Sequence, residues 1–259
     1  MLVTVASLNS PGVTTTAMGL ATHWPDNRRP VVVELDPEGG DIAGRWQVHP
    51  EPGLADVAAA VASTVDAGPE FLSAGLQPIE AAGAVVEVVC APPGGQVVRQ
   101  ALPLLTAPGS KVLNPAEGVV IADLGNLYAV SPAWQALAAA DAVVLVVEGT
   151  LAHLAHLRSR LDEAETQARL GSRAALAVAE ADYTAAEVEE VFLAADLPLH
   201  LLGPSGTAAS VTADAGSRRR DRRAHRAWSA LAASVADFAA ALDRPALTGA
   251  ATTRTGEAS

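Results

Sequence analysis

Lysine is almost absent from this sequence: Lys111, placed in an expected loop, is the only one among the 17 basic residues. Aromatic residues make up 3% of the chain, so the core must be built from Ala, Val and Leu. The single cysteine, Cys90, excludes an internal disulfide and offers no cysteine cluster for a metal. No apolar run reaches about 18 residues, and no basic segment precedes the first apolar run, so we expect neither a membrane span nor a signal peptide. These absences predict a cytoplasmic protein.

The 259 residues are 50% hydrophobic, which suffices for one large α/β domain. The formal net charge of −12 argues against a protein that binds nucleic acid over its whole surface.

Short Val-rich runs alternate with Ala/Leu-rich helical patterns along most of the chain. This alternation predicts a three-layer, doubly wound and mostly parallel sheet, whose ligands bind at the carboxyl ends of the strands. We expect one domain over residues 1–243 and a flexible tail over 244–259. The expected strands are 2–8, 31–36, 85–91, 119–124, 142–147, 175–179 and 199–202. The expected helices are 14–24, 53–65, 95–106, 131–140, 150–169, 184–194 and 221–243.

The segment between the first strand and the first helix has the outline of a phosphate-binding loop. In such loops backbone N–H groups cradle the phosphates, a lysine neutralises their charge, and the next Ser/Thr hydroxyl ligates Mg²⁺. The cradle would be formed by Gly12, Val13, Thr14 and Thr15, with Thr14 as the Mg²⁺ ligand. Pro11 removes one N–H donor. The alternative is a plain strand-to-helix turn in which Thr14 caps the helix.

This loop resembles that of the ParA/MinD family of deviant-Walker P-loop ATPases, which reads roughly K-G-G-x-G-K-T-T-T. The resemblance places the signature lysine of the family on Leu8 and its catalytic lysine on Val13, so both lysines are missing. The third glycine is kept as Gly12. The first two glycines fall on Asn9 and Ser10, and the threonines on Thr14, Thr15 and Thr16.

Three further segments fit the family in the same order, and the likeness extends over roughly residues 1–243. Residues 31–40 are similar to the second strand and its acidic turn, with Glu34 and Asp36 at the two acidic positions. Residues 119–125 are similar to the Walker B strand, and residues 142–149 to the strand that follows it. The resemblance implies that Asp36 positions water and that Asp123 lies on the metal side. The alternative is that these carboxylates bond to neighbouring loop amides.

A basic cluster spans the start of the last expected helix. It holds six of the 17 basic residues: Arg218, Arg219, Arg220, Arg222, Arg223 and Arg226. Such a patch suits DNA phosphates, an anionic membrane, an acidic partner, or acidic faces of this protein itself. The rest of that helix carries Trp228, Leu231, Val235, Phe238 and Leu242 at spacings of three and four, which predicts an apolar face packed on the sheet or, alternatively, on a membrane.

The missing lysines make ordinary ATP hydrolysis unexpected. The sequence therefore predicts a degenerate, catalytically impaired member of the family that acts as a spatial organiser or assembly scaffold. Pilus or secretion positioning, partitioning and division-site placement are the settings that the resemblance implies, with ATP and Mg²⁺ as cofactors if any bind. We expect a homodimer that does not need nucleotide, and a protein partner of the positioned system. The alternatives are a slow ATPase with an arginine from the basic cluster in place of the lysine, and a DNA or membrane tether.

Overall fold

The computed structural model describes residues 1–259 except 65, 195–198, 207–210, 212–217 and 244–259, and it describes only the backbone of residues 194 and 218–221. The tail predicted over 244–259 therefore lies outside the described residues.

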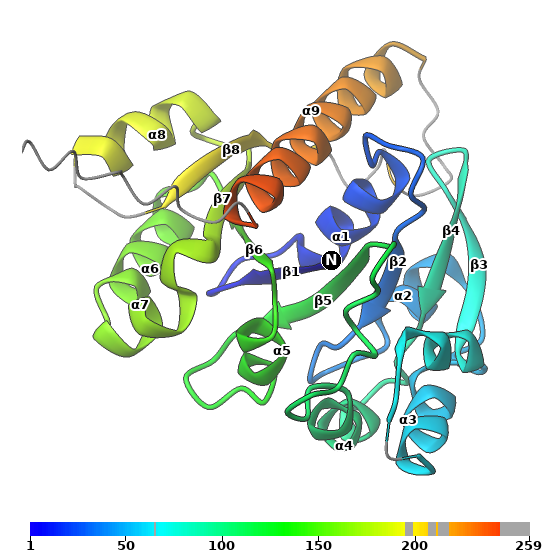
Figure 1. Ribbon diagram of the computed structural model, residues 1–259. Helices are drawn as coiled ribbons and strands as arrows, with labels where there is room; N and C mark the ends of the chain where they lie inside the picture. Colours follow the sequence, from blue (N-terminus) through cyan, green and yellow to red (C-terminus); the bar gives the residue numbers. More distant parts are fainter. Residues whose placement is uncertain (65, 195–198, 207–210, 212–217, 244–259) are drawn as a thin grey trace, which may run out of the picture.

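An eight-stranded sheet forms the middle layer of the molecule (Figure 1). Its strand order is β3-β4-β2-β5-β1-β6-β7-β8, and every neighbouring pair is parallel except β3 with β4. The strands are β1 (Leu2–Ser7), β2 (Val31–Glu34), β3 (Leu76–Ala81), β4 (Ala84–Val89), β5 (Val120–Asn126), β6 (Ala142–Glu148), β7 (Ala174–Ala179) and β8 (His200–Pro204). The predicted doubly wound, mostly parallel sheet is confirmed.

Helices cover both faces of this sheet. On one face lie α1 (Val13–Thr22) and α9 (Arg218–Leu242), which contact each other. The other described helices are α2 (Asp41–Trp46), α3 (Leu54–Ala62), α4 (Gln96–Leu105), α5 (Trp134–Ala138), α6 (Leu151–Leu161), α7 (Ala164–Leu170) and α8 (Ala185–Ala194). Short 3-10 turns occur at Pro69–Ala74 and Gly171–Arg173.

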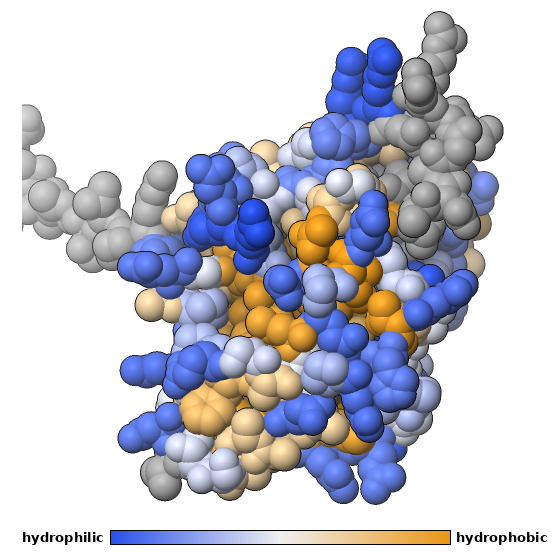
Figure 2. Space-filling view, turned by 90° about the vertical axis from the view of Figure 1, so that its right-hand side faces the viewer, coloured by the Kyte–Doolittle hydropathy of each residue, from blue (hydrophilic) through white to orange (hydrophobic). Residues whose placement is uncertain are grey.

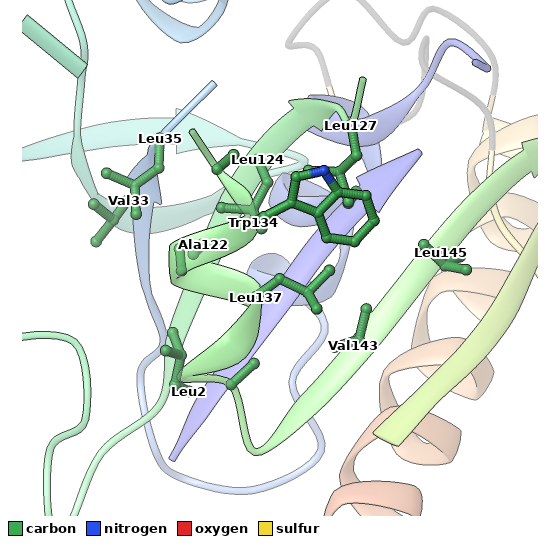
Figure 3. Close-up of a cluster of buried hydrophobic side chains, with 14 of the residues drawn as sticks. Leu2, Val33, Leu35, Ala122, Leu124, Leu127, Trp134, Leu137, Val143 and Leu145 are labelled. Atoms are coloured by element: carbon green, nitrogen blue, oxygen red, sulfur yellow. The ribbon is translucent and has the colours of Figure 1, made fainter. Parts of the chain in front are cut away.

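Two apolar cores fill the spaces between the layers. The larger contains buried side chains of α3 to α8; Figure 3 shows its centre, where Trp134 and Leu137 of α5 face Leu2 and Leu124 of β1 and β5. The smaller lies under α1 and α9. As predicted, Ala, Val and Leu dominate both cores.

In Figure 2 apolar side chains reach the surface in the middle of the face shown, and polar groups surround them.

Three details differ from the expected elements. β3 was not expected, and it extends the sheet as an antiparallel edge strand because a tight turn at Ala82 and Gly83, both with positive φ, returns the chain along β4. The short helix α2 was also not expected. The single helix expected over 150–169 is two helices, and Glu163 is the N-cap of the second.

This break decides how the acids in that region relate to the helix dipole. Within one long helix, acids in the second half would oppose the helix dipole. In the structure Glu163 and Glu165 lie at the start of α7, where negative charge is favourable, and the Glu163 carboxylate accepts a hydrogen bond from the Thr166 hydroxyl at 3.0 Å.

The last helix packs on the sheet, as one of the two alternatives predicted. Trp228, Leu231 and Val235 are buried, and the Trp228 ring lies so close to Gly19 of α1 that a Cβ there would come within 2.5 Å of it. No described helix is long and apolar enough to cross a membrane. Lys111 lies in a loop, as expected.

Candidate functional site

The carboxyl ends of three adjacent strands bring the predicted loop and acids to one edge of the sheet. β5 lies between β2 and β1, and Asp123 pairs in register with both Glu34 and Val5. The loop from Asn9 to Gly12 follows β1 directly. The position of the predicted site is therefore a consequence of strand order.

Serine side chains tie the loop to its neighbours. The Ser10 N–H donates to the Ser7 hydroxyl at 3.2 Å, and the N–H of Glu148, at the end of β6, donates to the Ser10 hydroxyl at 2.7 Å. The Ser7 hydroxyl also contacts the Asn126 side-chain oxygen. Asn9 has a φ of 127°, in the region that favours glycine. Ser10, at a family glycine position, thus connects the loop to β6.

The two lysine positions are occupied by core residues. Leu8 is 5% exposed and belongs to the larger core, whereas Val13 is 6% exposed and belongs to the smaller core. Both side chains contribute to packing, so neither reaches the loop surface to neutralise phosphate charge.

Helix α1 begins immediately after the loop. Its N-cap is Gly12, with a φ of 101°, and the carbonyl of Gly12 accepts from the Thr16 N–H at 2.9 Å. Thr14 is therefore inside the first turn, and the alternative prediction that it caps the helix is wrong. No side chain caps this helix end and its first turn holds no acidic residue, so the positive end of α1 faces the site.

Glu34 is fully buried at the end of β2 and accepts three backbone hydrogen bonds. Its Oε1 accepts from the N–H groups of Asp41 and Ile42 at 2.6 and 3.1 Å, and its Oε2 accepts from Ala91 at 2.8 Å. Burial raises its pKa to about 7 against the opposing effect of these bonds. For Glu34 the alternative of bonding to loop amides is confirmed for Ala91, whereas Asp41 and Ile42 belong to the first turn of α2.

Asp123 is also fully buried, but one of its oxygens has no partner. Its Oδ1 accepts from the Gly125 N–H at 3.1 Å, and among the described residues its Oδ2 has no hydrogen bond. Burial raises its pKa to about 7; the Thr14 hydroxyl beside it acts in the opposite direction, and Glu34 and Asp36 add to the rise. An unpartnered buried carboxylate oxygen is costly and suits a bound cation.

Asp36 is half-buried at the mouth of the site. It accepts from the Glu38 N–H at 2.9 Å, and burial raises its pKa. Its carboxylate lies against Gly125, where a Cβ would come within 2.0 Å of Oδ2. Asp36, Glu34 and Asp123 therefore gather at one edge. Nevertheless, no group of three His, Cys, Asp or Glu side chains in the described part of the chain could hold a metal ion by itself.

A cation that the sequence analysis missed lies beside the loop. Arg45 of α2 donates from Nη1 to the Thr15 hydroxyl at 3.1 Å and from Nη2 to Asp41 Oδ2 at 3.0 Å. Asp41 Oδ2 also accepts from the Thr14 hydroxyl at 3.3 Å. The i,i+4 spacing of Asp41 and Arg45 after two glycines was the available signal for this ion pair. It has that meaning only within a helix, so α2 had to be recognised first.

The described part of the basic cluster lies away from this loop. Arg222, Arg223 and Arg226 are exposed, and His225 Nδ1 lies 2.8 Å from Nε2 of His23, the C-cap of α1. Ten residues of helix, roughly 15 Å, separate that end of α1 from the loop. The structure thus does not bring these three arginines to Val13; the side chains of residues 218–221 lie outside the described part.

Solved structures with the same architecture cover nearly the whole chain. The cell division ATPase MinD of Pyrococcus furiosus matches 92% of this chain and 98% of its own, with a TM-score of 0.62 and 16% identity. The chain has the ParA/MinD fold. The septum site-determining protein MinD of Pyrococcus horikoshii, complexed with Mg-ADP, covers 95% of this chain and 100% of its own at TM-score 0.61 and 15% identity.

A third structure with the ParA/MinD fold is a ParA family ATPase from Chlorobium tepidum, which covers 92% of this chain and 98% of its own at TM-score 0.57 and 16% identity. No protein-family model and no curated protein matches the sequence. The similarity to proteins with the ParA/MinD fold is therefore one of structure.

Proposed function

We propose that this protein is a spatial organiser or assembly scaffold with the ParA/MinD fold and that it does not hydrolyse ATP at an ordinary rate. The observation that carries the proposal is the burial of Leu8 and Val13 in the two cores, at the positions where the resembled family has its lysines. Structural neighbours named as division-site and ParA family ATPases support the organiser role. Pilus or secretion positioning, partitioning and division-site placement remain the proposed settings.

If Mg²⁺ and ATP bind, the residues that would hold them are present in part. The backbone of Gly12 to Thr15 and the positive end of α1 would receive phosphate, and the Thr14 hydroxyl and Asp123 would hold Mg²⁺. The unpartnered Oδ2 of Asp123 fits such a cation. Bound Mg²⁺ would neutralise phosphate charge.

Phosphate release from ATP tests the catalytic part of the proposal. We expect release by the purified chain with Mg²⁺ to equal that of Asp123→Asn, because Val13 offers no cation. Release that depends on Asp123 would overturn the proposal and favour the slow ATPase.

Sizing by light scattering tests the scaffold part. We expect a homodimer with and without Mg-ATP, because Leu8 is packed in the core and cannot reach a phosphate of a second copy. A monomer that dimerises only with ATP would contradict this expectation.

A second candidate function is a tether to DNA or anionic membrane. It is supported by the exposure of Arg222, Arg223 and Arg226 on one end of α9. Changing these three, together with Arg218, Arg219 and Arg220, to Ala should abolish salt-sensitive binding to duplex DNA or phosphatidylserine vesicles. Changing Arg158, Arg160 and Arg169 to Ala is the control, since these arginines pair with acids on α6 and α7. Equal binding by all variants would exclude the tether.

A further inference from the structure

Asp41 and Arg45 form a closed set of hydrogen bonds with the start of α1. Thr14 donates to Asp41, Arg45 donates to Asp41, and the same guanidinium donates to Thr15. The carboxylate and the guanidinium thus link two consecutive threonine hydroxyls in the first turn of α1. The side chains of Asp41 and Arg45 are 51% and 40% exposed, so solvent and solutes can reach this pair.

The position of Asp41 is one that favours an anion. The positive end of α1 has no acidic residue of its own and no side-chain cap. Asp41 supplies negative charge there from a neighbouring helix, and it accepts a hydrogen bond from the Thr14 hydroxyl. A phosphate oxygen is negatively charged and accepts hydrogen bonds, as this carboxylate oxygen does.

Two structural features hold Asp41 and Arg45 at this position. The Asp41 N–H donates to the buried Glu34 at 2.6 Å, which fixes the start of α2. Gly40 lies against Pro93, where a Cβ would come within 2.8 Å of the backbone. The pair is therefore presented by a fixed turn rather than by a free side chain.

An independent observation points to a ligand at the same place. Oδ2 of the fully buried Asp123 has no partner among the described residues, and the Thr14 hydroxyl lies close enough to lower the pKa of Asp123. Thr14 thus lies between a carboxylate that lacks a cation and a carboxylate that occupies an anion position. A phosphate–Mg²⁺ pair would satisfy both.

We propose that Arg45 is the phosphate-binding cation of this site and that Asp41 is an internal anion that a polyphosphate displaces. The inference rests on the proposed retention of a phosphate site in the scaffold. When a polyphosphate binds, Thr14 and Arg45 exchange Asp41 for phosphate oxygens. Arg45 then supplies, from α2, the charge that Val13 cannot supply from α1.

Calorimetric titration of the full chain with pyrophosphate and Mg²⁺ tests this exchange. We expect Asp41→Asn to bind pyrophosphate about tenfold more tightly than the unchanged protein, because the internal competitor loses its charge. Arg45→Gln should bind about tenfold more weakly, and Arg45→Lys should recover part of the loss. Glu38→Gln is the matched control: it removes one exposed negative charge from the same turn without touching Thr14, and should change affinity much less than Asp41→Asn.

Four outcomes decide the inference. Pyrophosphate binding by Asp41→Asn but not by the unchanged protein supports it, because this result means that the Asp41 carboxylate blocks the site completely. Equal binding by Arg45→Gln and the unchanged protein overturns it, as does an equal gain from Glu38→Gln and Asp41→Asn. No pyrophosphate binding by either the unchanged protein or a folded Asp41→Asn also overturns it. That last result does not affect the scaffold proposal, which only the phosphate-release and sizing experiments can overturn. Thermal melts establish that each variant is folded, and Asp41→Ser replaces Asp41→Asn if the latter is not.

Discussion

Two buried carboxylates lie side by side, one at the end of β2 and one within β5, and differ in what holds them. Glu34 and Asp123 are register partners, both fully buried, and burial raises the pKa of each to about 7. Glu34 accepts three backbone N–H bonds, two from the first turn of α2 and one from the turn after β4. Asp123 accepts one such bond, and its second oxygen is unpartnered in the described structure.

The difference separates a structural acid from a candidate binding acid. Glu34 connects α2 and the turn after β4 to the sheet, so its partners are supplied by the fold. Asp123 lies beside Glu34 in register and is equally buried, but the fold leaves one of its acceptors unused. Burial alone therefore does not distinguish the two acids; the count of satisfied oxygens does, and it makes Asp123 the candidate for binding.

Glu34→Gln should have the largest effect on stability. An amide keeps one acceptor oxygen but turns an NH₂ group towards backbone N–H donors, which leaves buried donors unsatisfied. We expect the free energy of unfolding to fall by about 2–4 kcal/mol in urea titrations at neutral pH. If Glu34→Gln were as stable as the unchanged protein, the distinction between the two acids would not hold.

Asp123→Asn should have a smaller effect that depends on pH. The pKa of Asp123 rises from an ordinary 3.8 to about 7, so the folded protein binds a proton more tightly than the unfolded chain does. The carboxyl group therefore imposes no penalty below about pH 4, a growing penalty as pH rises towards 7, and a constant penalty above. In urea titrations, the free energy of unfolding of Asp123→Asn minus that of the unchanged protein should be about 2 kcal/mol larger at pH 8 than at pH 4. A difference that does not change with pH would contradict the assigned pKa.

Asp36→Asn should have the smallest effect. Its carboxylate is half-buried, and an asparagine oxygen can still accept from the Glu38 N–H. We expect the free energy of unfolding to change by less than about 1 kcal/mol. A loss as large as that of Glu34→Gln would place Asp36 among the structural acids.

The fold was predictable because its strands are continuous apolar runs separated by helical patterns. The elements that were missed are those with weak patterns. β3 contains Pro78 and exposed Glu80, and α2 has only six residues, too few for a helical periodicity to show. The break between α6 and α7 also lacks Gly or Pro, since Glu163 caps the second helix instead.

The candidate site was predictable in position and only partly in content. Strand order places Asp123 and the loop together, and the missing lysines are visible in the sequence. The contacts of Arg45 were not predictable, because they depend on the turn that Gly40 and Pro93 shape between strands distant in sequence. The separation of Glu34 from Asp123 likewise needed the hydrogen bonds to be known.

Both margins of the sheet carry a proline, and this limits how copies could join. Pro78 lies within β3, and Pro204 ends β8. Proline has no N–H to donate, so each margin lacks a bond that a neighbouring strand would need. Exposed Glu80 adds charge to the β3 margin. A scaffold built from this protein would therefore not grow by lengthening its sheet into a continuous ribbon.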